Sequence, residues 1–374
     1  MQVIVIGAGI IGAAVAESLA TAGAAVTVLD MRGPGLGASQ ASAGMLTPYI
    51  EAEGHRPMLE LGARSLSLYD EFIARLLEHS RTPIEYGRAG TLEVALDSDG
   101  VDRLLSAKSA LDDANVPSDW LDGNVLRGFE PSVTPAAIGG LFTLDHGFVG
   151  VGSLLTALVQ QARLAGATFE FPVEVTGVEQ HGSRTTVRAG GRLYESDAVV
   201  LASGSWSRSI RVAGIAPVPV RPVRGQLLHL HWCEGEQPGR IVWGPHCYAV
   251  PWSDGSLLVG ATVEDAGFDE GTTVAGVSSL TSAVIELLPH ASGARMEAVR
   301  VGLRPALPDG LPAIGPFADV PRVVAATGHY RSGILLAPLT ALMVTRYLLE
   351  GYDDPAFPLT SPDRLMSTPP RPFE

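Results

Sequence analysis

The first thirty residues combine two short apolar runs with a helical segment between them. Residues 3–6 are apolar without polar alternation, which predicts a strand that is buried on both faces. An alanine-rich segment at residues 13–22 has helical character and stops at Gly23. Residues 26–29 form a second apolar run. This order predicts a strand–helix–strand unit at the start of a parallel sheet.

The rest of the chain changes its periodicity more than once. Helical spacing marks residues 58–77, 151–165 and 334–350. Strand-like segments occur at residues 168–178, 197–202, 225–230, 256–263 and 323–326, and the whole region 217–300 is rich in them. The alternation between parallel and antiparallel character predicts two domains, each assembled from non-contiguous segments.

Composition narrows the class of protein. The 374 residues are 46% hydrophobic and 18% charged, which is enough apolar mass for a large core. With 26 Lys and Arg against 40 Asp and Glu, the net charge is −14, which argues against nucleic acid or an anionic membrane as a partner. Cys233 and Cys247 are too few for a disulfide framework or a four-ligand zinc site, so we expect no metal and two cysteines packed as small apolar residues.

The apolar ends of the chain invite comparison with targeting segments. The N-terminal stretch lacks a basic region, and Glu17 interrupts it, so it does not resemble a signal peptide. The last apolar run contains Pro338 and Arg346, and we expect it to be too short to span a bilayer. These features predict a soluble, cytoplasmic protein.

A glycine-rich turn after the first strand matches the pattern G-x-G-x-x-G. In that pattern Gly7 permits a tight turn, Gly9 lets a pyrophosphate approach the backbone, and Gly12 lets the helix pack closely on the strand. The helix N-terminus attracts phosphate, and Asp30 at the end of the second strand can accept hydrogen bonds from a ribose diol. The unit predicts a site for FAD or NAD rather than NADP, because an acid disfavours a 2′-phosphate.

Further motifs show a family resemblance. The small-residue loop GASQASAGML, the strand VVLASGSW and the C-terminal segments GLRPALPDGLPAIG and ATGHYRSGILLAP resemble the D-amino-acid oxidase family of FAD-dependent oxidoreductases. Within that family the chain is most similar to the glycine oxidases of thiamine biosynthesis, from residue 1 to about residue 350. On its own, the small-residue loop is equally compatible with an ordinary flexible connection.

The resemblance implies an α/β plus α+β architecture. A Rossmann-like FAD domain of the GR2 type, with a parallel sheet, would comprise residues 1–83, 145–216 and 301–374. A substrate domain built on a large antiparallel sheet would comprise residues 84–144 and 217–300. The stretch 304–309 has no cysteine, so we expect FAD to be bound non-covalently. A small amino acid and O2 are the implied partners, and a homo-oligomer is the implied assembly.

The resemblance also assigns the residues of the FAD site. They are Gly7, Gly9, Ile10, Ile11, Gly12, Asp30, Met31, Ala38, Ser39, Ala43, Gly44, Met45, Val173, Ser203, Gly204, His329, Tyr330, Arg331, Ser332, Gly333, Ile334 and Leu335. The helix that opens after Gly333 would point its positive dipole end at the flavin.

A carboxylate clamp is the expected substrate site. Arginine binds carboxylate as a permanently charged fork, and the resemblance assigns this role to Arg304 and Arg331, with Tyr248 assisting. No catalytic base is assigned, because hydride transfer to flavin needs none, and His246 and His329 are interpreted as ordinary histidines.

The expected activity is oxidation of glycine to the 2-oxo acid, with O2 reduced to hydrogen peroxide. Alternatives are an oxidase of sarcosine, a D-amino acid or a proline-like imino acid, and a dehydrogenase with another electron acceptor. A non-catalytic flavin-binding subunit is disfavoured because it would have no use for a carboxylate clamp.

Overall fold

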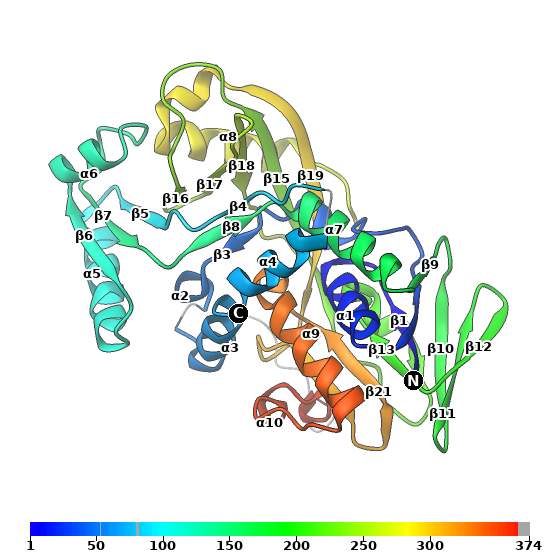
Figure 1. Cartoon of the computed structure of the whole chain (residues 1–374). Helices are drawn as coiled ribbons and strands as arrows, with labels where there is room; N and C mark the ends of the chain where they lie inside the picture. The colour runs from blue at the N-terminus through cyan, green and yellow to red at the C-terminus, as the bar shows by residue number, and fades with distance from the viewer. Residues whose placement is uncertain (53, 80–81, 366–374) are drawn as a thin grey trace.

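The protein is described here from a computed structural model that covers residues 1–52, 54–79 and 82–365 (Figure 1). Its first sheet is the predicted Rossmann-like sheet, which is parallel except for the antiparallel edge strand β20. In spatial order its six strands are β20 (Ala313–Phe317), β21 (Val320–Thr327), β13 (Ala198–Leu201), β1 (Gln2–Ile6), β2 (Ala25–Leu29) and β9 (Thr168–Glu170). The central strands β1 and β13 are buried almost throughout, as their unbroken apolar sequences predict.

Helices cover one face of this sheet and a smaller sheet covers the other. The helical layer consists of α1 (Ile10–Thr21), α3 (Arg56–Leu66), α4 (Tyr69–His79), α7 (Val151–Leu164) and α9 (Gly333–Glu350), which share one apolar core (Figure 1). The opposite layer contains β10 (Val175–His181), β11 (Arg184–Ala189), β12 (Arg192–Ser196) and β14 (Arg211–Val212). The carboxyl ends of β1, β2 and β13 are left open between the layers, where a ligand can enter.

The second large sheet is mostly antiparallel and has eight strands. Its spatial order is β19 (Arg295–Ala306), β15 (Arg221–His231), β18 (Ser256–Gly260), β17 (Tyr248–Pro251), β16 (Ile241–Trp243), β5 (Thr91–Ala95), β7 (Gly139–Thr143) and β6 (Ser118–Asp122). The associated helices are α5 (Ser98–Asp113), α6 (Gly123–Phe129) and α8 (Val274–Leu287). The two-sheet architecture confirms the predicted fold class, whereas the domain boundaries stay a prediction.

Short elements connect the two sheets. A three-stranded sheet is formed by β3 (Met45–Leu46), β8 (Gly147–Val149) and β4 (Tyr86–Gly87). The remaining short helices are η1 (Ala38–Ala41), α2 (Pro48–Glu51), η2 (Gly204–Ser209), η3 (Pro289–Gly293), α10 (Phe357–Thr360) and η4 (Pro362–Leu365). The far end of β19 packs against η1 and η2, and the Ser205 hydroxyl donates a 2.8 Å hydrogen bond to the Leu303 carbonyl. The antiparallel sheet is thereby joined to the Rossmann-like sheet at the open strand ends.

Helix α9 contains a proline that its neighbours accommodate. Pro338 has no N–H to donate to the carbonyl of Ile334 one turn earlier. Instead, the Tyr69 hydroxyl donates a 2.5 Å hydrogen bond to that carbonyl, and the Ser65 hydroxyl donates a 2.6 Å bond to the carbonyl of Leu335. The first turn of α9 is therefore held by α3 and α4 as well as by its own backbone.

Three expectations from the sequence need correction. The helix expected at residues 58–77 is two helices, α3 and α4, because the chain breaks at residues 67–68. The strand-rich region 217–300 also contains α8, whose small polar residues mask its helical period. Cys233 is exposed, whereas Cys247 is buried as expected.

Helix α9 is longer than the sequence analysis expected. By length and composition alone, residues 333–350 could cross a membrane, contrary to our expectation. However, 61% of that window is buried inside the protein. Its apolar character is explained by its place in the core that covers the Rossmann-like sheet.

Candidate active site

One cavity of about 1040 Å³ lies where the open strand ends of the first sheet meet the face of the second. This volume is at the upper limit of ordinary ligand pockets, which suits a dinucleotide together with a small substrate. Most of the predicted site residues line the cavity: Gly7, Gly9, Ile10, Ile11, Asp30, Met31, Ala38, Ser39, Ala43, Met45, Val173, Ser203, Gly204, Tyr248, Arg304, His329, Tyr330, Arg331, Gly333 and Ile334.

Four predicted cofactor residues are not part of that lining. A Cβ on Gly12 would overlap the Gly7 carbonyl, so Gly12 serves the close packing of α1 on the turn. Gly44 has a φ of 76° and lies against the carbonyl of Val149. Ser332 and Leu335 are buried beside the first turn of α9. These residues shape the walls without facing the cavity.

The first side of the cavity, formed by Gly7, Gly9, Asp30, Ser39 and Val173, is called the dinucleotide wall below. Gly7 has a φ of 106°, and a Cβ there would overlap the carbonyl of Ala202. Only glycine combines this left-handed conformation with so close an approach. The turn therefore has the tight geometry that the sequence pattern predicts.

Asp30 holds the turn of the dinucleotide wall together. Its carboxylate accepts hydrogen bonds from the backbone N–H groups of Ala8 at 2.7 Å, Arg32 at 2.7 Å and Gly33 at 2.8 Å. A carboxylate has about four acceptor positions, so these bonds use most of its capacity. The predicted contact with a ribose diol would use the remaining acceptor position of the carboxylate.

Ser39 occupies a backbone donor at the N-terminus of α1. Its hydroxyl oxygen accepts a 3.0 Å hydrogen bond from the N–H of Ile10. The expected donation from Ile10 to a pyrophosphate therefore competes with a bond inside the protein. The wall still presents the helix N-terminus, an open backbone at Gly9 and the small residues of η1, which fit the pyrophosphate of FAD.

Another part of the cavity lining contains Tyr248, Arg304 and Arg331, called the arginine cluster below. Tyr248 begins β17, Arg304 lies near the end of β19, and Arg331 lies in the turn before α9. The Tyr330 N–H donates a 2.9 Å hydrogen bond to the Pro305 carbonyl and so brings this turn beside β19. Three segments that are far apart in the sequence thus meet.

Within the arginine cluster, neighbouring groups shift the pKa values of Tyr248 and Arg304. Burial raises the pKa of Tyr248 to about 12, although Arg304 and Arg331 oppose that rise. Burial also lowers the pKa of the Arg304 guanidinium, and the positive charge of neighbouring Arg331 lowers it further. Arginine remains protonated in proteins, so the cluster concentrates positive charge beside a phenol that keeps its proton. Such a site attracts an anionic group.

The two candidate histidines differ in their surroundings. His329 is buried, and its Nε2 lies 3.0 Å from the Thr340 hydroxyl. Burial lowers the pKa of His329 to about 3, so its ring is neutral near pH 7. His246 is exposed at the cavity wall. These positions fit the interpretation of both as ordinary histidines.

The acidic residues of the cavity that the sequence analysis missed are Glu51, Glu93 and Glu174. Glu51, at the end of α2, acts electrostatically on both Tyr248 and Arg304. Burial raises the pKa of Glu93 in β5 to about 7, with Arg103 opposing this effect from 3.9 Å. A lone acid inside the apolar strand at residues 91–95 was the signal that could have identified Glu93. Nothing in the local pattern marks Glu51.

Comparisons with known proteins identify the family of this chain. The DAO family, described as FAD dependent oxidoreductase, matches residues 2–347. A bifunctional protein ThiO/ThiG of Synechocystis is 33% identical over 98% of the chain, and the chain spans 54% of that relative's length. Glycine oxidase of Bacillus licheniformis is 30% identical, with 92% of both chains covered.

A solved structure shows the same fold. The crystal structure of glycine oxidase from Geobacillus kaustophilus superposes with a TM-score of 0.92 and 29% identity, covering 98% of this chain and 99% of that one. The cofactor of the matched family is FAD, which the dinucleotide wall fits. The chain therefore belongs to the DAO family of FAD-dependent oxidoreductases.

Proposed function

We propose that the protein oxidises glycine and related small amino acids, converting glycine, water and O2 to glyoxylate, ammonia and hydrogen peroxide. The observation that carries this proposal is the arginine cluster, which lies in the same cavity as the dinucleotide wall. Two guanidinium groups beside a redox cofactor suit a substrate that carries a carboxylate. Similarity to glycine oxidases supports glycine as the substrate.

The cluster would bind the substrate by its carboxylate. Arg304 and Arg331 supply charge and N–H donors, and the Tyr248 hydroxyl, which keeps its proton, donates a further hydrogen bond. Holding the carboxylate orients the neighbouring Cα–H and amine toward the rest of the cavity. Bound FAD supplies the two-electron oxidation of that carbon–nitrogen unit.

The start of α9 would stabilise negative charge that develops in the cavity during the reaction. Gly333 and Ile334 of its first turn line the cavity, so the positive end of the helix dipole faces it. Preorganised charge of this kind stabilises a developing anion without a side-chain catalyst. Neutral, buried His329 beside this turn is bonded to Thr340 and fits a packing role.

A peroxide assay of the FAD-loaded protein with glycine, sarcosine, D-alanine and D-proline tests the proposal. We expect peroxide, with glycine giving the highest kcat/KM. A higher value for another of these amines would replace glycine but keep the reaction class. Flavin that is reduced by glycine under nitrogen and not reoxidised by air would point to the dehydrogenase alternative. A protein that takes up no FAD contradicts the proposal entirely.

Three finer points also belong to this proposal. We assign the oxidation to thiamine biosynthesis on the strength of the similarity to ThiO/ThiG. Rescue of a thiamine-requiring bacterial strain that lacks its own glycine oxidase tests this assignment. FAD released by acid denaturation would confirm non-covalent binding, and light scattering would test the expected homo-oligomer.

A further inference from the structure

The side chain of Arg304 crosses a neighbouring strand to reach its hydrogen-bond partner. Arg304 in β19 is paired with Val223 in β15. A Cβ on Gly225, two residues further along β15, would overlap the guanidinium, so this group lies directly against the Gly225 backbone. On the far side of β15 the Arg304 Nη1 donates a 2.9 Å hydrogen bond to the carbonyl of Thr262. The same Nη1 donates a longer, 3.5 Å hydrogen bond to the Arg224 carbonyl, so Thr262 provides the nearer of the two carbonyls that set the direction of this arginine.

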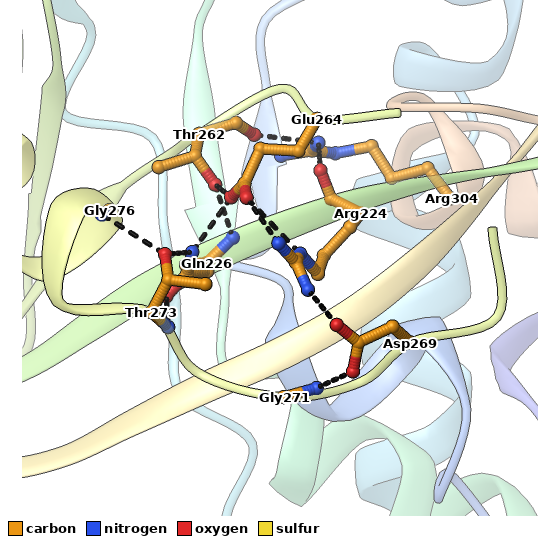
Figure 2. A network of polar contacts seen from close by, with 9 residues as sticks. All are labelled: Arg224, Gln226, Thr262, Glu264, Asp269, Gly271, Thr273, Gly276 and Arg304. Carbon is orange, nitrogen blue, oxygen red and sulfur yellow. Dashed lines mark hydrogen bonds and ion pairs between the residues drawn. The ribbon is translucent and has the colours of Figure 1, made fainter. Parts of the chain in front are cut away.

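Thr262 is fixed by its other polar groups (Figure 2). Its N–H donates a 3.2 Å hydrogen bond to the Gln226 carbonyl, and its hydroxyl oxygen accepts a 2.8 Å bond from the Gln226 N–H. The same hydroxyl donates a 2.5 Å bond to Oε1 of Glu264. The carbonyl that holds Arg304 therefore belongs to a residue with little freedom to rotate.

Glu264 is the centre of the contacts that hold Thr262. Its Oε2 accepts hydrogen bonds from Arg224 at 2.7 Å and 3.2 Å, and its Oε1 accepts a 2.7 Å bond from the Gln226 side chain (Figure 2). Burial alone would raise the pKa of Glu264, but the hydrogen bonds from Thr262, Gln226 and Arg224 hold it below its usual value. Glu264 is therefore ionised at neutral pH and paired on both oxygens.

The network continues into the surrounding chain. Arg224 Nη1 donates a 2.6 Å bond to Asp269, and the Gln226 side chain is bonded to Thr273, whose hydroxyl caps the N-terminus of α8. The side chains of Arg224, Gln226, Thr262 and Glu264 are absent from the lining of the cavity, whereas Arg304 is part of it. The network thus acts on Arg304 from outside the cavity.

We propose that Glu264 and Thr262 are positioning residues that set the carboxylate affinity of the cavity through Arg304. This inference rests on the proposed function, since it gives Arg304 a carboxylate to bind. Guanidinium has five N–H donors in a fixed plane, and anchoring one end at the Thr262 carbonyl determines where the remaining donors point. A bidentate contact with carboxylate requires that direction to be preset.

The test compares Glu264→Gln and Thr262→Val with wild type, all loaded with FAD. Thr262→Val removes the hydroxyl that is bonded to Glu264, and Glu264→Gln removes the charge and one of the two acceptor oxygens that hold Arg224, Gln226 and Thr262. Both substitutions nearly keep the shape of the side chain. We expect KM for glycine to rise about tenfold in each, with kcat changed less than about twofold, as for loss of a hydrogen bond to a charged network. Thr262→Ser keeps the hydroxyl and should restore the wild-type KM.

A second readout uses acetate, which has the carboxylate but no oxidisable amine. Its dissociation constant, measured from the change in flavin absorbance, should rise by the same factor as KM in both variants. Acetate binding also separates this inference from the proposed function. If no amine yields peroxide, the proposed function fails, and the acetate titrations still decide whether the network positions Arg304.

Glu130→Gln is the matched control. Glu130 accepts hydrogen bonds from Arg240 at 3.2 Å and from the Gly239 N–H at 3.1 Å, and it lies outside the cavity lining. Losing this buried pair should lower Tm and leave KM and acetate affinity unchanged. The inference is overturned by unchanged acetate affinity in both test variants, by an equal loss in the control, or by a wild-type protein that does not bind acetate.

Discussion

The dinucleotide wall and the arginine cluster line one cavity but are built in opposite ways. The wall is mainly backbone, in which Gly7 has no room for a Cβ and Asp30 is occupied by three backbone N–H groups. The cluster consists of long side chains from three separate segments, with Arg304 anchored by a carbonyl across a strand. A wall made of backbone tolerates few substitutions, whereas a cluster made of side chains can be adjusted one contact at a time.

The largest expected effect is on the dinucleotide wall, where Gly7→Ala should abolish FAD binding. The new Cβ would meet the Ala202 carbonyl, and the left-handed φ adds strain, for a combined cost of about 4 kcal/mol. We expect FAD to be lost, as measured by the ratio of flavin to protein absorbance after gel filtration. Gly23→Ala is the control, because Gly23 also has a positive φ but no atom within 4 Å of its Cβ position. Retention of FAD in Gly7→Ala would contradict this view of the wall.

Removing one member of the cluster should spare the cofactor. Arg331→Ala is expected to retain FAD and to lower kcat/KM for glycine by about 2–4 kcal/mol, mainly through KM. Steady-state kinetics and the flavin spectrum check both parts. Should amines without a carboxylate be the better substrates of the wild-type protein, the clamp argument would fail.

The stability of the protein should also depend on pH through Glu93, which lines the cavity outside the arginine cluster. Glu93 has a pKa of about 7 in the folded protein, against 4.5 for an unperturbed glutamate. Below about pH 4.5 both folded and unfolded states are protonated, but as pH rises toward 7 the unfolded chain ionises first. Wild type therefore loses stability across this interval, and the loss is complete above about pH 7.

Glu93→Gln removes that loss. Relative to wild type, its free energy of unfolding should increase by about 3 kcal/mol between pH 4.5 and pH 8. Thermal unfolding of the FAD-loaded proteins across this range measures the difference. Glu60→Gln, at an exposed helix position, is the control and should show no such trend. A difference that stays constant with pH would show that Glu93 is already ionised when folded.

The smallest expected change in kcat/KM comes from removing the neutral hydrogen-bond donor of the cluster rather than one of its charged donors. Tyr248→Phe removes one neutral donor and keeps the ring that packs over Gly260. We expect kcat/KM for glycine to fall by about 1 kcal/mol, which is less than for Arg331→Ala. Parallel kinetics of the two variants test this order, and a reversed order would assign the main binding role to the phenol.

The same contrast explains what the sequence could predict. The dinucleotide wall lies largely within the first forty residues, so its spacing alone predicts the turn, the helix start and Asp30. Arg304, Arg331 and Tyr248 were assigned only through the family resemblance, because no local pattern shows that distant segments meet. Glu51 and Thr262 were missed for the same reason. The break between α3 and α4 could not be predicted from the sequence, because the apolar residues of both helices follow one continuous helical spacing.

The bonds from Ser65 and Tyr69 to the first turn of α9 have a consequence for biosynthesis. The glycine turn is synthesised before β21 and α9, which complete its sheet and cover it. Until residue 350 has emerged, α3 and α4 lack the helix that they hold, and the cavity lacks Arg331. The complete cavity can therefore form only after α9 has been synthesised.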